Sequence, residues 1–220
     1  MANIRLSQSV DKLPLKQQGG FAVFADLLPL VLHQAMLHEA QRLFPYAKES
    51  VVIEPDAEQL RGGHPPRSFL SVAAGPVQNV LYQSPDLKAF LEQLTGLPIY
   101  RSGLQGSYSF YVRIGDHLSL HRDVEACDLA VITCLYDFTP SFEKGGILCL
   151  YPNRCEEPLS QIRMTLNQGC VPVYLAPNQT IVMYGGLIPH LLTPIVSMQT
   201  RIVSILCFSI QNKSIRMRVS

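Results

Sequence analysis

The stretch YVRIGDHLSLHRD, residues 111–123, decides the fold and the chemistry expected of this chain. Its apolar and polar residues form two short strand-like runs on either side of the turn signal Gly115-Asp116. In the second run, residues 118–123, His121 and Asp123 stand two positions apart. Side chains at positions i and i+2 of a strand point to the same face, so we expect this imidazole and this carboxylate to lie together.

The pattern of short β-branched and aromatic runs continues on both sides of this stretch. Such runs with turns between them, and no clear helical pattern in the gaps, predict an antiparallel sandwich or jelly-roll barrel. The eight predicted strands are Tyr108–Ile114, Leu118–Asp123, Leu129–Phe138, Gly146–Tyr151, Val171–Leu175, Thr180–Tyr184, Pro189–Ile195 and Arg201–Ile210.

The first hundred residues predict helices with a few strands. Apolar residues at spacings of three and four predict a helix that Asp26 caps and that runs to about Phe44. A second helix is expected over Ser84–Thr95, with Ser84 as its N-cap and Gly96 as its stop. We therefore expect one α+β, mainly β domain over residues 1–220: an N-terminal buttress of helices and strands (1–105) against a jelly-roll core (106–210).

Composition narrows the classes of partner. Of the 220 residues, 47% are hydrophobic and 16% are charged, a composition that excludes intrinsic disorder. The formal net charge is +1. A near-neutral balance predicts no nucleic-acid partner and no anionic membrane partner. No apolar run is long enough to span a bilayer, and residues 1–20 have no signal-peptide core. A homodimer is compatible with the sequence.

The six cysteines all lie in the second half of the chain and form no CxxC pair. Cys134 and Cys207 lie in apolar strand-like runs, where a thiol usually packs as a small hydrophobe. We therefore expect a reduced chain in the cytoplasm.

A metal bound by His121 and Asp123 would need a third ligand. The one histidine later in the chain is His190, in GGLIPHLLTP. Two imidazoles and one carboxylate on one face of an ion form the facial triad suited to non-haem Fe(II), which leaves three positions open. Arg201 follows eleven residues later, and we expect its strand to be the antiparallel neighbour of the His190 strand. A buried arginine needs an anion, and the far carboxylate of a dicarboxylate cosubstrate would supply one.

Several segments in order resemble the Fe(II)/2-oxoglutarate-dependent dioxygenases, nearest to their prolyl-hydroxylase-like branch. The matching segments are YVRIGDHLSLHRD, ITCLYDF, KGGILCLYP, IPHLLTPI and TRIVSILCF, within residues 108–208. The resemblance implies a double-stranded β-helix (jelly-roll) barrel buttressed by the N-terminal helices. It also implies Fe(II) at His121, Asp123 and His190, with 2-oxoglutarate held by Arg201 and Tyr111 and O2 as the oxidant.

Two positions depart from the family pattern. Oxygen-sensing prolyl hydroxylases have a cosubstrate-binding tyrosine where this chain has Asp137, with Tyr136 one position earlier. A one-residue shift changes the face, so either a bulge brings Tyr136 into use or another group does its work. Ser204 lies three rather than two residues after Arg201, so it is not assigned to the site.

The implied reaction couples decarboxylation of 2-oxoglutarate to succinate with oxidation, by default hydroxylation, of a C–H bond. We expect a small-molecule substrate such as an amino acid or a natural-product intermediate. A peptidyl or protein hydroxylase is the alternative within the enzyme class, and a cupin-like metal- or ligand-binding barrel without turnover is the alternative outside it.

Each motif also has a structural interpretation. His121 and Asp123 would then be a surface pair, His190 a satisfied core histidine, and Arg201 the ion-pair partner of Asp137 or Asp128. Loop 62–68 offers His64 and Arg67 to a substrate carboxylate, or is an ordinary surface loop. Arg122 alternates with inward positions and is expected to face solvent.

Overall fold

The structure is a computed structural model that describes residues 6, 14–53, 61–104, 106–138 and 145–210. The absence of a signal peptide was expected from residues 1–20, most of which lie outside the described ranges. The helices are η1 (Leu15–Gln18), α1 (Leu30–Leu43), η2 (Phe44–Tyr46), α2 (Pro76–Tyr82), α3 (Pro85–Thr95), η3 (Pro152–Arg154) and α4 (Leu159–Met164). The strands are β1 (Phe21–Ala25), β2 (Lys48–Val52), β3 (Arg67–Ala73), β4 (Ile99–Arg101), β5 (Ser107–Tyr111), β6 (His117–His121), β7 (Leu129–Phe138), β8 (Leu148–Leu150), β9 (Val171–Val173), β10 (Gln179–Met183), β11 (His190–Leu192) and β12 (Thr200–Ile210).

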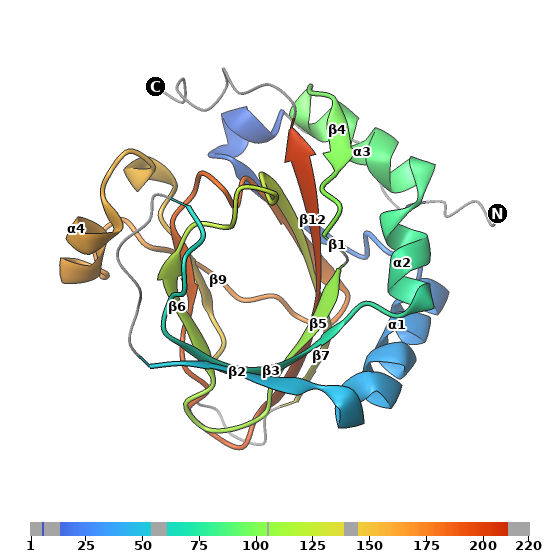
Figure 1. The fold of residues 1–220 in the computed structure, drawn as a ribbon. Helices are drawn as coiled ribbons and strands as arrows, with labels where there is room; N and C mark the ends of the chain where they lie inside the picture. Colours follow the sequence, from blue (N-terminus) through green and yellow to red (C-terminus); the bar gives the residue numbers. More distant parts are fainter. Residues whose placement is uncertain (1–5, 7–13, 54–60, 105, 139–144, 211–220) are drawn as a thin grey trace.

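The strands form one antiparallel sheet that folds over on itself (Figure 1). Hydrogen-bonded neighbours follow the order β1-β10-β7-β12-β5-β3-β6-β11-β8-β9, with β2 beside β3 and β4 beside β12. The sheet bends between β3 and β6, so that β1-β10-β7-β12-β5-β3 makes one wall and β6-β11-β8-β9 the other. This arrangement confirms the predicted double-stranded β-helix.

Helices α1, α2 and α3 cover the outer face of the larger wall, and α4 lies at the opposite side of the molecule (Figure 1). Alternate residues of the long strands divide between two cores. On β12, Ile202, Leu206 and Phe208 pack outward against the helices, in a cluster that also contains Met36 and Leu91. A second buried cluster fills the barrel and includes Ala130, Cys134, Leu148, Leu175 and Met183.

Helix α3 begins and ends where the sequence predicts. The Ser84 hydroxyl accepts hydrogen bonds from the backbone N–H groups of Asp86 and Leu87, which satisfies two donors of the first turn. Gly96 ends the helix in the left-handed conformation with φ = 70°.

Helix α1 starts later than predicted. Asp26 does not cap it, because its backbone has a left-handed φ of 52° and Pro29 occupies the N-cap position. The residue before a proline is disfavoured in helical geometry, which keeps Leu28 out of the helix and delays its start to Leu30. The helix ends at Leu43, and Phe44 begins the short η2.

All eight strands predicted after residue 106 are present, most of them shorter than predicted. Two details of that prediction are wrong. The gap between β8 and β9 contains the helix α4. The strands of His190 and Arg201 are not neighbours, because β11 pairs with β6 and β8 whereas β12 pairs with β4, β5 and β7. In the described ranges, no helix has the length and apolar character needed to cross a bilayer.

Candidate metal centre

His121, Asp123 and His190 come together at one end of the smaller wall. His121 is the last residue of β6 and His190 the first of β11, and the two are direct partners in the antiparallel register. Their rings lie 4.2 Å apart between centroids. Asp123 follows β6 by two residues, and its N–H donates to Gly185 O at 2.9 Å. Its Oδ1 lies 3.6 Å from His121 Nε2 and 3.7 Å from His190 Nε2.

Each imidazole is oriented by a hydrogen bond on its other nitrogen. His121 Nδ1 lies 2.8 Å from Ser119 O, and His190 Nδ1 lies 2.8 Å from Ile188 O. A carbonyl oxygen only accepts, so Nδ1 carries the proton in both rings and both Nε2 lone pairs face Asp123. This is the tautomer that a metal-binding histidine requires.

The charges of the three groups suit a divalent cation. Burial, with the neighbouring His121, lowers the pKa of His190 to about 4, so this ring is neutral at pH 7. Burial raises the pKa of Asp123, but His190, His121 and Arg61 more than offset that effect and leave it below its usual range. One carboxylate and two imidazoles therefore converge, with ligand atoms within 4.8 Å of one another.

The three residues open into a small cavity of about 80 Å³ inside the barrel. Tyr111 and Arg201 also line this cavity. The remaining lining residues are apolar: Leu118, Ala130, Ile132, Leu148, Leu175, Leu192, Val203 and Ile205. A larger cavity of about 310 Å³ near Lys16, Pro152 and Tyr184 contains none of the three. The smaller cavity is therefore where the predicted metal and cosubstrate residues meet.

Arg201 lies on the inward face of β12 and is 1% exposed. Its register partners are Asp137 on β7 and Tyr111 on β5. Nη1 donates to Asp137 Oδ2 and, at 3.0 Å, to Leu175 O, whereas the buried Nε has no partner. Gly146 leaves the space beside it, since a Cβ there would lie 3.0 Å from Arg201 Cδ. Nη1 of Arg201 therefore forms a structural ion pair with Asp137, which was the structural interpretation of Arg201 in the sequence. Its Nε takes no part in that ion pair.

A β-bulge places Asp137 opposite Arg201. Ile202 pairs with Tyr136 but Val203 pairs with Cys134, so Leu135 is the extra residue on β7. The bulge turns Tyr136 toward the core under the helices and Asp137 into the barrel. Gln199 Nε2 also donates to both Asp137 oxygens, at 3.0 and 3.3 Å. The position opposite Arg201 on β7 is therefore occupied by a carboxylate and not by the Tyr136 phenol.

Tyr111 lines the cavity beside Arg201 and is 3% exposed. Burial is the main cause that raises the pKa of its phenol far above the usual range, so the group stays a neutral hydrogen-bond donor. Ser204 points the other way, and its hydroxyl accepts from Gln78 Nε2 at 2.7 Å on the helix side of the sheet. The structure thus brings Tyr111 into the cavity and leaves Ser204 outside it.

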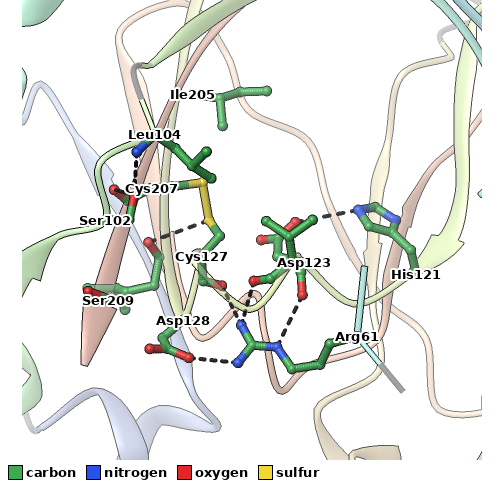
Figure 2. The surroundings of a disulfide bond; sticks show 12 residues. Arg61, Ser102, Leu104, His121, Asp123, Cys127, Asp128, Ile205, Cys207 and Ser209 are labelled. Carbon is green, nitrogen blue, oxygen red and sulfur yellow. Dashed lines mark hydrogen bonds and ion pairs between the residues drawn. A yellow bond between two sulfur atoms is a disulfide. The ribbon is translucent and has the colours of Figure 1, made fainter. Parts of the chain in front are cut away.

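The expectation of reduced cysteines is wrong for one pair. Cys127 and Cys207 form a disulfide across 80 residues, with 4.8 Å between their Cα atoms. Cys207 lies on the inward face of β12 and Cys127 in the turn that follows Asp123, so the bond ties the metal-ligand segment to the opposite wall (Figure 2). Strand contacts between distant segments are not visible in the cysteine spacing.

Two arginines near the site were misjudged or missed. Arg122 was expected to face solvent, but it is 3% exposed and donates to the carbonyls of Leu187, Cys155 and Glu157. Arg61 was not considered, although it contacts the segment that carries Asp123 (Figure 2). Their partners are mainly backbone carbonyls, which leave no signal in a sequence. Arg67, a candidate for a substrate carboxylate, donates to Ser50 Oγ at 2.8 Å.

No family model and no curated protein matches this chain. Solved structures do. A prolyl-4-hydroxylase from Pseudomonas putida aligns over 88% of this chain and 94% of its own, with 16% identity and a TM-score of 0.59. EctD from S. alaskensis with bound Fe aligns over 94% and 81%, with 16% identity and a TM-score of 0.63.

The non-heme alpha ketoglutarate dependent carbocyclase SnoK from nogalamycin biosynthesis aligns over 94% of this chain and 87% of its own, with 12% identity and a TM-score of 0.66. At such identities the likeness speaks for architecture, and it spans nearly the whole of each chain. This chain has the double-stranded β-helix fold of the Fe(II)/2-oxoglutarate-dependent oxygenases.

Proposed function

We propose that this protein is an Fe(II)- and 2-oxoglutarate-dependent oxygenase that hydroxylates a C–H bond of a small molecule. The observation that carries the proposal is the convergence of His121, Asp123, His190 and Arg201 on one buried cavity. The four residues come from both walls of the barrel, and neither a core histidine nor a surface ion pair requires that arrangement.

The three ligands fit a ferrous ion. Both Nε2 lone pairs and the Asp123 carboxylate face a common point, and backbone hydrogen bonds hold both rings. Three protein ligands on one side leave the remaining positions to the cosubstrate and O2. Iron bound there would supply O2 activation coupled to the oxidative decarboxylation of 2-oxoglutarate to succinate and CO2.

Arg201 fits the distal carboxylate of 2-oxoglutarate. Its buried Nε has no partner, and an unpaired buried donor is costly until an acceptor arrives. Tyr111 lines the cavity beside it with a neutral hydroxyl, the second donor expected for that carboxylate. Asp137 already takes part of the Arg201 charge, so the cosubstrate carboxylate shares the guanidinium with it.

The chain's apolar residues determine what else enters the cavity. Leu118, Leu148, Leu175 and Leu192 line it, and they exclude water from the reacting atoms. The comparison proteins include a carbocyclase of nogalamycin biosynthesis and a prolyl-4-hydroxylase, so a peptidyl hydroxylase is the alternative that a substrate screen must include.

The test begins with purified protein under anaerobic conditions. Adding Fe(II) and 2-oxoglutarate should produce the weak visible charge-transfer band of an Fe(II)–2-oxoacid chelate, and admission of O2 should then release succinate. Intact, folded protein that shows neither band nor succinate would contradict the proposal and favour the cupin-like barrel without turnover.

A variant pair tests the role of Arg201. Arg201→Met removes one charge-assisted contact and should weaken 2-oxoglutarate binding by about one to two orders of magnitude, while iron affinity changes little. Arg154→Met is the control, because Arg154 does not line this cavity and pairs with Glu157. Equal losses of iron and 2-oxoglutarate in Arg201→Met would mean that Arg201 is only structural.

Two further expectations from the sequence stay predictions: a single domain over residues 1–220, and a cytoplasmic location. The Cys127–Cys207 disulfide weighs against the location, because structural disulfides are rare in reducing compartments. Cell fractionation tests the location directly.

A further inference from the structure

The Asp123 ligand lies outside the hydrogen-bonded ladder of the barrel. Strand β6 ends at His121, so the segment 123–128 leaves the sheet as a turn. A metal ligand needs its side chain held within a narrow range of positions, and a turn supplies less restraint than a strand. The main-chain hydrogen bond from Asp123 N to Gly185 O fixes the start of this segment, and the Cys127–Cys207 disulfide and the hydrogen bond from Ile210 N to Asp128 Oδ2 fix its end.

Arg61, from a distant part of the chain, joins the start of this segment to its end. Its Nε donates to Asp123 O at 3.2 Å, and its Nη2 to Val124 O at 2.7 Å and Cys127 O at 3.0 Å. Its Nη1 donates to Asp128 Oδ1 at 2.7 Å. Figure 2 shows the guanidinium between Asp123 and Asp128, with all four contacts on one turn.

Two glycines pack closely against the side chains of Asp123 and Arg61. A Cβ at residue 186 would lie 2.0 Å from Arg61 Nη2, and one at residue 185 would lie 1.9 Å from Asp123 Oδ2. The Gly185-Gly186 pair therefore backs both the arginine and the ligand. A planar fork with five N–H groups meets four acceptors in fixed directions, and a lysine ammonium, with three donors from one point, does not.

We propose that Arg61 is a positioning residue of the metal centre, which holds the turn 123–128 so that the Asp123 carboxylate stays facing His121 and His190. The proposal rests on the proposed function, since it concerns the same ion. A structural ion pair with Asp128 alone accounts for one of the four contacts. The other three go to main-chain carbonyls of the turn, and the first of them belongs to Asp123 itself.

Arg154 offers a matched control that does not contact the turn 123–128. The side chain of Arg154 is 12% exposed, as is that of Arg61, and each pairs with one carboxylate, which for Arg154 is that of Glu157. It also donates to the carbonyls of Thr165 and Gln168, and it contacts none of the three ligands. Arg154→Lys therefore measures how much stability is lost when a largely buried arginine loses its guanidinium but no contact to the turn 123–128 is removed.

The test measures Mn(II) affinity by calorimetry and the melting temperature of the wild type, Arg61→Lys and Arg154→Lys. We expect Arg61→Lys to weaken Mn(II) binding about 10- to 100-fold, as loss of an outer-sphere partner does. Arg154→Lys should keep the wild-type affinity within about twofold even if its melting temperature falls as much. Unchanged Mn(II) affinity in Arg61→Lys, or equal losses in both variants, would overturn the role of Arg61.

The experiment distinguishes failure of the proposed function from failure of the role of Arg61. A wild type that binds no Mn(II) refutes the proposed function and this inference with it, whereas a wild type that binds and an Arg61→Lys that binds equally refutes only the inference. If Arg61→Lys does not fold, Asp128→Asn replaces it, because the amide is uncharged and its single oxygen can accept from only one of the two donors, Arg61 Nη1 and Ile210 N, while the three carbonyl contacts of Arg61 stay. We expect it to weaken Mn(II) binding a few-fold, and wild-type affinity would then count against the inference.

Discussion

Reduction of the Cys127–Cys207 disulfide should destabilise the fold strongly. The bond closes a loop across 80 residues, and the loop-closure entropy of the unfolded chain puts its contribution at about 4.5 kcal/mol. For a domain of this size, 1 kcal/mol corresponds to a shift of roughly 2–4 °C in melting temperature, so reduction should lower it by roughly 10–20 °C.

Thermal unfolding followed by circular dichroism, with and without a phosphine reductant, measures this shift. The double variant Cys127→Ala/Cys207→Ala is the control, and it should melt at the reduced temperature and no longer respond to reductant. Alkylation of the unfolded, unreduced wild type counts the thiols. Of six cysteines two are bonded, so four should react. Six reactive thiols, or a melting temperature that reductant does not change, would contradict this prediction.

Three further predictions concern the cavity. The pKa of His190, about 4, lies below its value of 6.5 in the unfolded chain, so the unfolded chain takes up the proton first as the pH falls. Between pH 6.5 and pH 4 the metal-free protein should therefore lose about 3 kcal/mol of stability, measured by urea unfolding. A stability that does not change over this range would contradict the prediction. Gly185→Ala places a Cβ 1.9 Å from Asp123 Oδ2 and should displace the carboxylate, so Mn(II) affinity should fall at least about tenfold by calorimetry; wild-type affinity would show that the turn adapts. Asp137→Asn removes the anion that shares Arg201 with the cosubstrate, so 2-oxoglutarate should bind about tenfold tighter in fluorescence titration; weaker binding would instead make Asp137 the residue that holds Arg201 in place.

The sequence predicts those parts of the fold that depend on local pattern. Short β-branched and aromatic runs identify all eight strands after residue 106, and the Ser84 and Gly96 caps define α3 because capping acts within one helical turn. The candidate ligands His121, Asp123 and His190 also follow from spacing and residue type, since metal chemistry uses few kinds of side chain. The structure brings all three together.

Strand pairing cannot be predicted in the same way. From β10 to β12 successive strands alternate between the walls, so the strands of His190 and Arg201 lie in different walls and are not neighbours. The bulge at Leu135 adds a single residue to β7 and reverses the faces of all that follow, which brings Asp137 rather than Tyr136 to Arg201. No local pattern marks that position.

Long-range contacts to the main chain are the other unpredicted part. Arg61 and Arg122 look like surface residues in the sequence, yet both are largely buried and bound to carbonyl groups of turns. The Cys127–Cys207 bond likewise depends on the barrel closing. Each of these contacts follows from the fold, so it becomes visible only when the fold is known.

The central claim is that His121, Asp123 and His190 share one iron ion. Crystals grown anaerobically with Fe(II) allow an anomalous-difference map on both sides of the iron absorption edge. We predict one strong peak between the two Nε2 atoms and the Asp123 carboxylate, present above the edge and absent below it. A structure with intact side chains and no peak there, or with iron bound elsewhere, would contradict the account.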